Sequence, residues 1–367
     1  MNPSPDLLDL PPLGAGQFAA IEDQVAALLR TESDVIIQQG EALLPLEAAI
    51  RSAVHPGSTA LNIVTGPYGQ TFGHWLRDCG AKVVDLAVPY HAAVSAEQVA
   101  EALRAHPETE FVSLVHAEAA TGNTNPVAEI GAVVRESGAL LMLDAVASVA
   151  AEPLRTDEWG VDLCVIGGQK AMGGPAGVSA VAVSPRAWAR ITANPAAPRR
   201  SYLSLLDWKE RWTDAGRTVL PHAPAQLEML ALGACLDRIA AEGLPAVIAR
   251  HRAAAAATRA GALALPGLSP FVPDQRAAAP VATTLRTADS LRADELAARL
   301  DRALPVQAGG GALAAEMLRV NHYGSAATLP TVLSVLTALA TATDADPAPA
   351  LQAAQLAWES APAPEPV

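Results

Sequence analysis

The stretch CVIGGQKAMGGPAGVSAV (residues 164–181) leaves one apolar strand, passes paired glycines on either side of Lys170, and enters a second apolar strand. Lysine is rare in this chain: of the 25 basic residues, only Lys82, Lys170 and Lys209 are lysines. A guanidinium stays protonated at any working pH, whereas a desolvated lysine can lose its proton near neutrality and attack a carbonyl. Lys170 is therefore either a nucleophilic amine or a solvated loop lysine, and this stretch alone leaves both interpretations open.

The sequence around Lys170 alternates short β-rich apolar runs with amphipathic helical stretches from about residue 60 to 185. The runs, in chain order, are ALNIV, TFGHWLRDCG, KVVDLAV, SAEQVAEALRAH, FVSLVH, VAEIGAVVRESG, ALLMLDAV, DLCVIGG and VSAVAVS. This alternation predicts an α/β fold in which helices cover a mostly parallel sheet. Three of the predicted strands lead into a polar residue, namely His116, Asp144 and Lys170. Because ligands bind at the carboxyl ends of such strands, we expect these side chains to converge on one crevice.

Asp144 lies at the end of its own buried strand, 26 positions before Lys170. A carboxylate in that place costs desolvation energy unless a cation or a hydrogen-bond donor meets it. Two interpretations remain open. Asp144 either caps the following turn or faces a protonated heteroaromatic nitrogen, which would keep the ring electron-poor.

The rest of the chain predicts a second, smaller unit. We expect a large cofactor-binding domain over residues 1–240, a small C-terminal α+β domain over 241–345, and a Pro/Ala-rich tail with a frayed end over 346–367. The small unit contains an Ala-rich helical stretch, the strand pattern PVATTLRT, and a final helix after MLRVNH.

Composition narrows the class of partner. With a net charge of -13 and no basic stripe, the chain is not expected to bind nucleic acid or an anionic membrane, so a small-molecule partner is favoured. The first residues, MNPSPDLLDL, lack the pattern of a secretory signal, and we expect a cytoplasmic protein. Cys79, Cys164 and Cys235 are scattered without paired metal-ligand spacing, so neither a disulfide framework nor a metal site is predicted.

Three spaced motifs carry a family resemblance: HAEAATGNTNP (116–126), LDAVAS (143–148) and GGQKAMGGPAG (167–177). Together they resemble the fold type I, class V aminotransferases that use pyridoxal phosphate, such as the alanine–glyoxylate and serine–pyruvate enzymes. The resemblance runs from about residue 35 to 325. It implies a large domain with a mostly parallel central sheet and a smaller C-terminal α+β domain.

The resemblance also implies roles for residues around the cofactor ring. Lys170 would form the Schiff base, and Asp144 would pair with the pyridine nitrogen. Val146 would pack against one face of the ring. In TGPYGQTFG (65–73), Tyr68 matches the aromatic residue that stacks over the ring; taken alone, it would be read as a turn residue.

Two further roles follow from the same resemblance. Gln169 matches a residue that hydrogen-bonds the cofactor phosphate. In MLRVNHYG (317–324), Arg319 matches the arginine that holds the substrate carboxylate, a task that suits its planar fork. The expected partners are a small amine, a 2-oxo acid and a second copy of the chain in a homodimer or homotetramer.

One departure from the family pattern concerns the phosphate. The family has a small-residue turn at an early helix N-terminus, where backbone N–H groups receive the phosphate, but this chain reads IIQQGEALLPLEAAI with Glu41 after the glycine. A carboxylate there would satisfy the same N–H groups and repel a dianion. Leu220 and Ala223 stand near the places of a Tyr and a Thr that a partner subunit lends to the phosphate.

This pattern most closely resembles the pyridoxamine–pyruvate transaminase subgroup, whose substrate is unphosphorylated vitamin B6. The subgroup likeness covers GExxLxLEAA (40–49), YGxxFGxW (68–75), VPY (88–90), AHPE (105–108), NPxAPR (194–199) and LSxxDW (203–208). We therefore expect transfer of an amino group from pyridoxamine to pyruvate, with Glu41 beside the ligand's hydroxymethyl group. Gly310 stands where the subgroup has a second arginine, and Ala119 where the family has a hydroxyl residue.

Two alternatives remain open. One is a conventional pyridoxal-phosphate-dependent aminotransferase of the alanine–glyoxylate or serine–pyruvate type, in which Gln169 and backbone amides hold the phosphate. The other is a non-catalytic B6-binding homologue.

Overall fold

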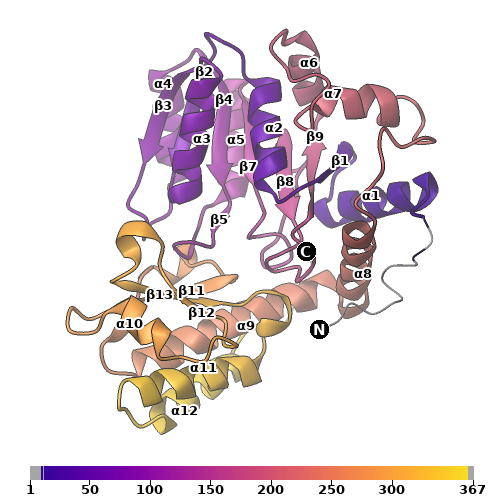
Figure 1. The fold of residues 1–367 in the computed structure, drawn as a ribbon. Coiled ribbons are helices and arrows are strands. Elements are labelled where there is room, and N and C mark those ends of the chain that lie inside the picture. The colour runs from indigo at the N-terminus through magenta and orange to yellow at the C-terminus, as the bar shows by residue number, and fades with distance from the viewer. Residues whose placement is uncertain (1–9, 11, 363–367) are drawn as a thin grey trace.

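The computed structural model describes residue 10 and residues 12–362 (Figure 1). Two predictions concern the ends of the chain: the first ten residues were expected to lack a secretory signal, and the last few were expected to be frayed. Most of those positions lie outside the described residues. The described chain folds around two sheets, one of which is large and mostly parallel, and the other small and antiparallel.

The large sheet has the strand order β1-β9-β8-β7-β4-β2-β3. Its strands are β1 (Asp34–Gln39), β2 (Thr59–Val64), β3 (Lys82–Ala87), β4 (Thr109–Val115), β7 (Leu140–Asp144), β8 (Leu163–Gly167) and β9 (Val178–Val183). The pairs from β3 to β8 are parallel, whereas β9 pairs antiparallel with both β8 and β1. The predicted α/β fold is thus confirmed, although the sequence analysis did not identify β1 as a strand.

Helices cover both faces of this sheet, as its continuous apolar strands require. The helices of this part are α1 (Ala15–Leu29), α2 (Leu43–Ala53), α3 (Pro67–Asp78), α4 (Ala96–Ala105), α5 (Val127–Ser137), α6 (Pro185–Ala193), α7 (Leu205–Trp208), a π-helical turn (Lys209–Thr213) and α8 (Gln226–Glu242). Figure 1 shows α2 and α3 in front of the strands and α5 behind them. The central strands β2, β7, β8 and β9 are buried along their whole length.

Local signals explain where several of these helices begin. Ser95 accepts a hydrogen bond from the backbone of Gln98, whose side chain bonds back to the Ser95 N–H, so α4 starts with a capping box. Ser184 caps α6 in the same way through its hydroxyl, with Pro185 in the first turn. Helix α3 differs because its N-cap residue, Gly66, offers no side-chain cap.

The C-terminal part is built on the small antiparallel sheet, in the order β10-β11-β13-β12. Its elements are α9 (Leu244–Leu263), β10 (Leu268–Pro270), β11 (Ala282–Thr287), α10 (Ala293–Ala298), β12 (Val306–Ala308), β13 (Met317–Asn321), α11 (Leu329–Ala342) and α12 (Ala348–Glu359). A separate apolar cluster joins this sheet to α9, α11 and α12. The Pro/Ala-rich stretch predicted as a tail therefore contains a packed helix, because Ala350 and Ala354 are fully buried. The domain boundaries at 240 and 345 remain a prediction.

The small sheet meets the carboxyl ends of the large sheet's strands (Figure 1). A two-stranded hairpin, β5 (Ala117–Glu118) and β6 (Asn123–Thr124), follows β4 and forms this junction. The Thr284 hydroxyl of β11 donates to the Thr121 carbonyl at 2.8 Å, and the Ala279 N–H donates to the Gly122 carbonyl at 2.8 Å. A ligand at the strand ends is therefore within reach of side chains from both sheets.

Candidate active site

Strands β4, β7 and β8 are neighbours, so their carboxyl ends lie side by side as the sequence predicts. Asp144 ends β7, paired with Val115 of β4 and Val165 of β8. The backbone of His116 joins this edge, since its N–H donates to the Asp144 carbonyl at 2.9 Å. Its ring packs edge-to-face on Trp159, with Nδ1 buried and unpaired, and burial lowers the His116 pKa to about 4. His116 is thus a neutral core residue.

Lys170 stands three residues beyond β8, with its Nζ 5.2 Å from the centre of the Tyr68 ring. Tyr68 comes from the first turn of α3, so two distant segments bring the amine and the aromatic ring together. This contact has the geometry of a cation–π pair.

The loop that carries Lys170 is fixed from several sides. The Gly173 N–H donates to the Lys170 carbonyl at 2.9 Å, and Arg238 of α8 donates to the Met172 carbonyl at 2.6 Å. Gly173 has a φ of +68°, and a Cβ there would lie 2.8 Å from the Cα of Gly324. The absence of a side chain at Gly173 thus allows the backbone at Gly324, which follows β13 of the small sheet, to pack against this loop.

Asp144 is buried beneath the lysine and the tyrosine. Its Oδ1 accepts the Val146 N–H at 2.9 Å, which also fixes Val146 next to it. Burial raises the Asp144 pKa, while the positive charge of Lys170 and the Val146 N–H lower it. The interpretation of Asp144 as the cap of its own turn is therefore confirmed. Its carboxylate also lies close enough to Lys170 for their charges to interact, and its pairing with a ring nitrogen remains a prediction.

Glu118 is a buried acid that the sequence analysis did not single out. Its exposed fraction is 0%, and neither carboxyl oxygen has a well-aligned hydrogen bond within the described chain. Burial, with a smaller contribution from Asp144, raises its pKa to about 8, and Lys170 is among the groups that lower it. The available signal was its position inside HAEAATG, a polar residue at the end of a buried strand.

The start of α2 is occupied by Glu41. Its Oε2 accepts the Leu43 N–H at 2.9 Å, and its Oε1 accepts from Nε2 of Gln169 at 2.7 Å. The other side-chain atom of Gln169, Oε1, is buried and has no hydrogen-bond partner in the part of the chain that the structure describes. Glu41 and Gln169, predicted as a phosphate-end pair, are therefore in direct contact.

Arg319 reaches the site from β13 of the small sheet. Its Nη1 donates to the Ala119 carbonyl at 3.4 Å and its Nη2 to Oε1 of Gln307 at 2.5 Å. The Nε–H is buried and has no partner within the described residues. A guanidinium with a free, buried N–H is suited to bind a carboxylate.

A small apolar wall adjoins both Arg319, which donates to the Ala119 carbonyl, and Lys170, which precedes Ala171 in the sequence. It is a cluster of buried alanines that includes Ala119, Ala147 and Ala171, with Tyr323 packed against it. Burial raises the Tyr323 pKa, and the charge of Arg319 lowers it. Tyr323 is a second residue that the sequence analysis missed, because nothing in MLRVNHYG marks it apart from its neighbour Arg319.

Gly310 stands where the subgroup has a second arginine. It is exposed, and a Cβ built on it would meet no atom within 4 Å. The side chain bonded to Arg319 in the structure is the neutral Gln307. Arg319 is therefore not joined there by a second guanidinium from the site residues described above.

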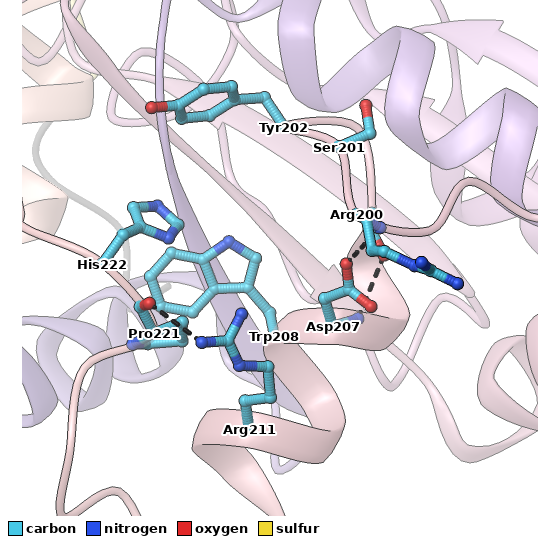
Figure 2. Close-up of a pocket in the computed structure, with 9 residues that line it drawn as sticks. Arg200, Ser201, Tyr202, Asp207, Trp208, Arg211, Pro221 and His222 are labelled. Carbon is cyan, nitrogen blue, oxygen red and sulfur yellow. Dashed lines mark hydrogen bonds between the residues drawn. The ribbon is translucent and has the colours of Figure 1, made fainter.

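A separate hollow of about 270 Å³ lies outside this group of residues (Figure 2). It is lined by Arg200, Ser201, Tyr202, Ser204, Asp207, Trp208, Arg211, Pro221 and His222. Figure 2 shows His222 between the Tyr202 and Trp208 rings, at centroid distances of 5.6 and 5.0 Å. None of the predicted site residues lines it.

Among the described residues, no group of His, Cys, Asp or Glu side chains is arranged to hold a metal ion. Within the same residues, no helix combines the length and apolar character needed to span a bilayer. The three cysteines are free thiols.

A family model for class V aminotransferases matches residues 15–329, which covers every site residue described above. The chain belongs to the class V aminotransferases. It is therefore an enzyme that transfers amino groups, and its site has a lysine, a buried aspartate and an aromatic ring at the strand ends. Membership of the family implies pyridoxal phosphate as the cofactor.

Relatives of this aminotransferase include enzymes with different printed substrates. A pyridoxamine–pyruvate transaminase from Mesorhizobium japonicum is 35% identical over 341 residues, covering 92% of this chain and 86% of the relative. An alanine–glyoxylate aminotransferase from Drosophila melanogaster is 29% identical over 299 residues, covering 80% and 75%. The crystal structure of pyridoxamine–pyruvate aminotransferase from Mesorhizobium loti superposes with a TM-score of 0.89 at 34% identity, covering 94% of this chain and 89% of that one. The expected fold type I architecture is confirmed.

The two ends of this aminotransferase's site fit pyridoxal phosphate unequally. At the ring end, the buried Asp144 carboxylate, the Tyr68 ring and the Lys170 amine match a protonated pyridine with a carbonyl substituent. At the other end, the Leu43 N–H at the start of α2 is already bonded to a carboxylate, that of Glu41. The residues present thus fit the ring of the cofactor better than its phosphate.

Proposed function

We propose that this aminotransferase moves the amino group of pyridoxamine to pyruvate, giving pyridoxal and L-alanine. The observation that carries the proposal is Glu41, whose carboxylate bonds both the first free N–H of α2 and Gln169. A phosphate dianion at that helix start would face a like charge within a few ångströms. A hydroxymethyl group would instead donate a hydrogen bond to the carboxylate, which favours the unphosphorylated vitamin.

In this proposal each residue around the ring has one task. When bound, the B6 ring supplies an electron-poor system that delocalises charge from the reacting carbon. Asp144 keeps a proton on the ring nitrogen through its buried carboxylate. Tyr68 holds the ring plane against the lysine, while Val146, fixed by its bond to Asp144, packs on the other face.

Lys170 moves the proton that the reaction must relocate between the amine-bearing carbon of pyridoxamine and C2 of the keto acid. The hydrogen bonds on its loop hold its Nζ beside Tyr68. Arg319 binds the pyruvate carboxylate through its free Nε–H and the adjoining fork, which orients the ketone toward the amine. The alanine wall next to Arg319 leaves space for a small methyl group.

The test compares pyridoxal with pyridoxal phosphate as ligands of the purified protein. Pyridoxal should bond to Lys170 at least as tightly as the phosphorylated form, followed by the lysine–ligand absorbance band, and pyridoxamine should then consume pyruvate. If only pyridoxal phosphate binds and alanine with glyoxylate reacts, the enzyme is a conventional member of the family, of the type suggested by the 29% identical relative. If neither ligand binds Lys170, the non-catalytic alternative is favoured.

We also propose that the enzyme is a homodimer or homotetramer, as the family resemblance implies. Two exposed apolar side chains belong to the segment that lines the hollow of Figure 2 or lies next to it in the sequence: Tyr202, in the lining, is 63% exposed, and Val219, two residues before Pro221 of the lining, is 72% exposed. A contiguous apolar patch at this place would be suited to contact with a second copy of the chain. Sedimentation of the wild type should give at least twice the chain mass, and the Tyr202→Glu, Val219→Glu double variant should dissociate. A monomeric wild type would contradict this part of the proposal.

A further inference from the structure

Glu118 stands at an unusual place, against the N-terminus of the helix that carries Tyr68. A Cβ added to Gly66, the N-cap residue of α3, would lie 2.3 Å from the Glu118 Cδ and 2.5 and 2.6 Å from its two oxygens. Only a residue without a side chain lets the carboxyl approach the backbone this closely. The chain has therefore placed a fully buried acid in contact with the first turn of this helix.

Helix α3 needs a group at this position. Its N-cap glycine has no side chain to accept a hydrogen bond, and Pro67 has no N–H, so the first free donors are those of Tyr68 and Gly69. Both N–H groups act on the Glu118 carboxyl and lower its pKa. The acid lies 50 positions further along the chain than Tyr68, so the group placed against this helix start comes from a distant segment, although, among the described residues, neither of its oxygens makes a well-aligned hydrogen bond there.

Charged and titratable groups surround this acid from the other elements packed against it. They are Asp144 from β7, Lys170 from the loop after β8, and the Tyr68 and Tyr90 phenols. With its pKa raised to about 8, Glu118 is mostly protonated at neutral pH. A neutral acid can face backbone N–H groups through its carbonyl oxygen without adding a second full negative charge beside Asp144.

We propose that Glu118 is a positioning residue of the B6 site: its carboxyl fixes the first turn of α3 and thereby holds the Tyr68 ring over Lys170. This role rests on the proposed function in so far as Tyr68 contacts the bound ring. Glu118 acts through the backbone of Tyr68, because its contacts are with Gly66 and with the N–H groups of Tyr68 and Gly69.

The experiment uses the full chain with Glu118→Gln, Glu118→Ala and Tyr68→Ala, alone and combined. Pyridoxal affinity is measured from the lysine–ligand absorbance band. In the wild-type background, Glu118→Ala should weaken pyridoxal binding about tenfold. In the Tyr68→Ala background the same change should weaken binding by less than about twofold, because the effects of two residues that act through one another do not add. Glu118→Gln should restore wild-type affinity at pH 7. Glu22→Gln, another buried acid with a raised pKa, is the matched control and should change nothing.

A second readout needs no ligand. In the free protein, hydrogen exchange in a peptide spanning residues 66–72 should become faster in Glu118→Ala and stay slow in Glu118→Gln. Equal losses with and without Tyr68, or slow exchange at α3 in Glu118→Ala, would overturn the proposal. If Glu118→Ala does not fold, a Glu118→Gln protein that exchanges rapidly at α3 overturns it as well, and one that stays protected supports it. Failure of the wild type to bind pyridoxal or its phosphate would count against the proposed function alone, since the exchange result still decides the role of Glu118.

Discussion

The three lysines of this chain occupy different environments, and only that of Lys170 is suited to a reactive amine. Lys82 is exposed on β3, and Lys209 is paired with Asp34 and Asp214 at 3.4 and 2.9 Å. Lys170 instead faces an aromatic ring and lies close enough to Asp144 to shift its pKa. A primary amine in these surroundings is suited to carbonyl and proton-transfer chemistry, and an arginine could not replace it.

Replacing Lys170 with Ala should therefore reduce pyruvate-dependent turnover of pyridoxamine at least about 1000-fold, since the group that transfers the proton is lost. The far-UV circular dichroism spectrum and the unfolding midpoint should stay close to those of the wild type. Lys82→Ala removes an exposed lysine and serves as the control, with unchanged activity. Substantial activity in Lys170→Ala would contradict the assignment of this residue.

Arg319 is expected to act on the keto acid and not on the vitamin. Arg319→Lys keeps the charge but loses the fork, so KM for pyruvate should rise roughly 10- to 100-fold with a much smaller change in pyridoxal affinity. Arg286→Lys, an exposed arginine on the neighbouring strand β11, is the matched control. An unchanged KM, or an equal loss of pyridoxal affinity, would show that Arg319 does not hold the carboxylate.

At the scale of elements, under the proposed function, the start of α2 selects between the phosphorylated and unphosphorylated forms of vitamin B6. Glu41→Gln keeps a side chain that can bond the Leu43 N–H and removes the negative charge. The affinity for pyridoxal phosphate relative to pyridoxal should rise about tenfold, because one like-charge repulsion is removed. Glu47→Gln, later in the same helix and paired with Arg51 at 2.6 Å, is the control and should leave the ratio unchanged. If Glu41→Gln leaves the ratio of the two affinities unchanged, the Glu41 carboxylate does not lie beside the phosphate end of the ligand.

Much of the element pattern was predictable from the sequence, and the exceptions have physical reasons. The alternating apolar runs predicted β2, β4, β7, β8 and β9 because buried strands need continuous apolar residues, and they also predicted the edge strand β3, which is only partly buried. Strand β1 was missed because its last two residues are glutamines; Gln38 is buried all the same, since its amide donates to the Tyr202 carbonyl at 2.7 Å. Helix α12 was missed because its Pro/Ala-rich composition also suits a frayed tail.

The site was predictable to a similar extent. Lys170 and Asp144 could be found because each stands at or just after the carboxyl end of an apolar strand, where ligands of α/β sheets bind. Glu118 and Tyr323 could not, since their importance lies in burial and in contacts with residues far away in the sequence. The pairing of Glu41 with Gln169, 128 positions apart, likewise appears only in three dimensions.

At the scale of the whole molecule, buried titratable groups link stability to pH. Burial raises the pKa of Glu118 to about 8, and those of Glu22 and Glu152 to about 7. Such groups bind more protons folded than unfolded above pH 4.5, so the free energy of unfolding falls as pH rises through that window. Buried histidines with lowered pKa values, including His322 at about 3, destabilise the fold mainly as pH falls below about 6.5.

Between pH 6.5 and 8 the carboxyl effect outweighs the smaller, opposing effect of the buried histidines, and the free energy of unfolding should fall by about 2 kcal/mol. Urea unfolding of the ligand-free protein at several pH values in this range measures it. Glu118→Gln should flatten the largest share of the slope, because this residue has the highest pKa of the three acids. A wild type whose stability is constant or rises over this range would contradict the buried, protonated state assigned to Glu118.

The large sheet carries Asp144 and leads into the Lys170 loop, the small sheet carries Arg319, and Glu41 lies at the start of α2. The most direct measurement is a titration of the wild type with pyridoxal and with pyridoxal phosphate in parallel, followed by assay of pyridoxamine with pyruvate. We predict that pyridoxal binds at least as tightly as its phosphate and that pyridoxal and alanine appear in equal amounts. Tight binding of pyridoxal phosphate alone, without turnover of pyridoxamine, would contradict the role given to Glu41 and the function proposed from it.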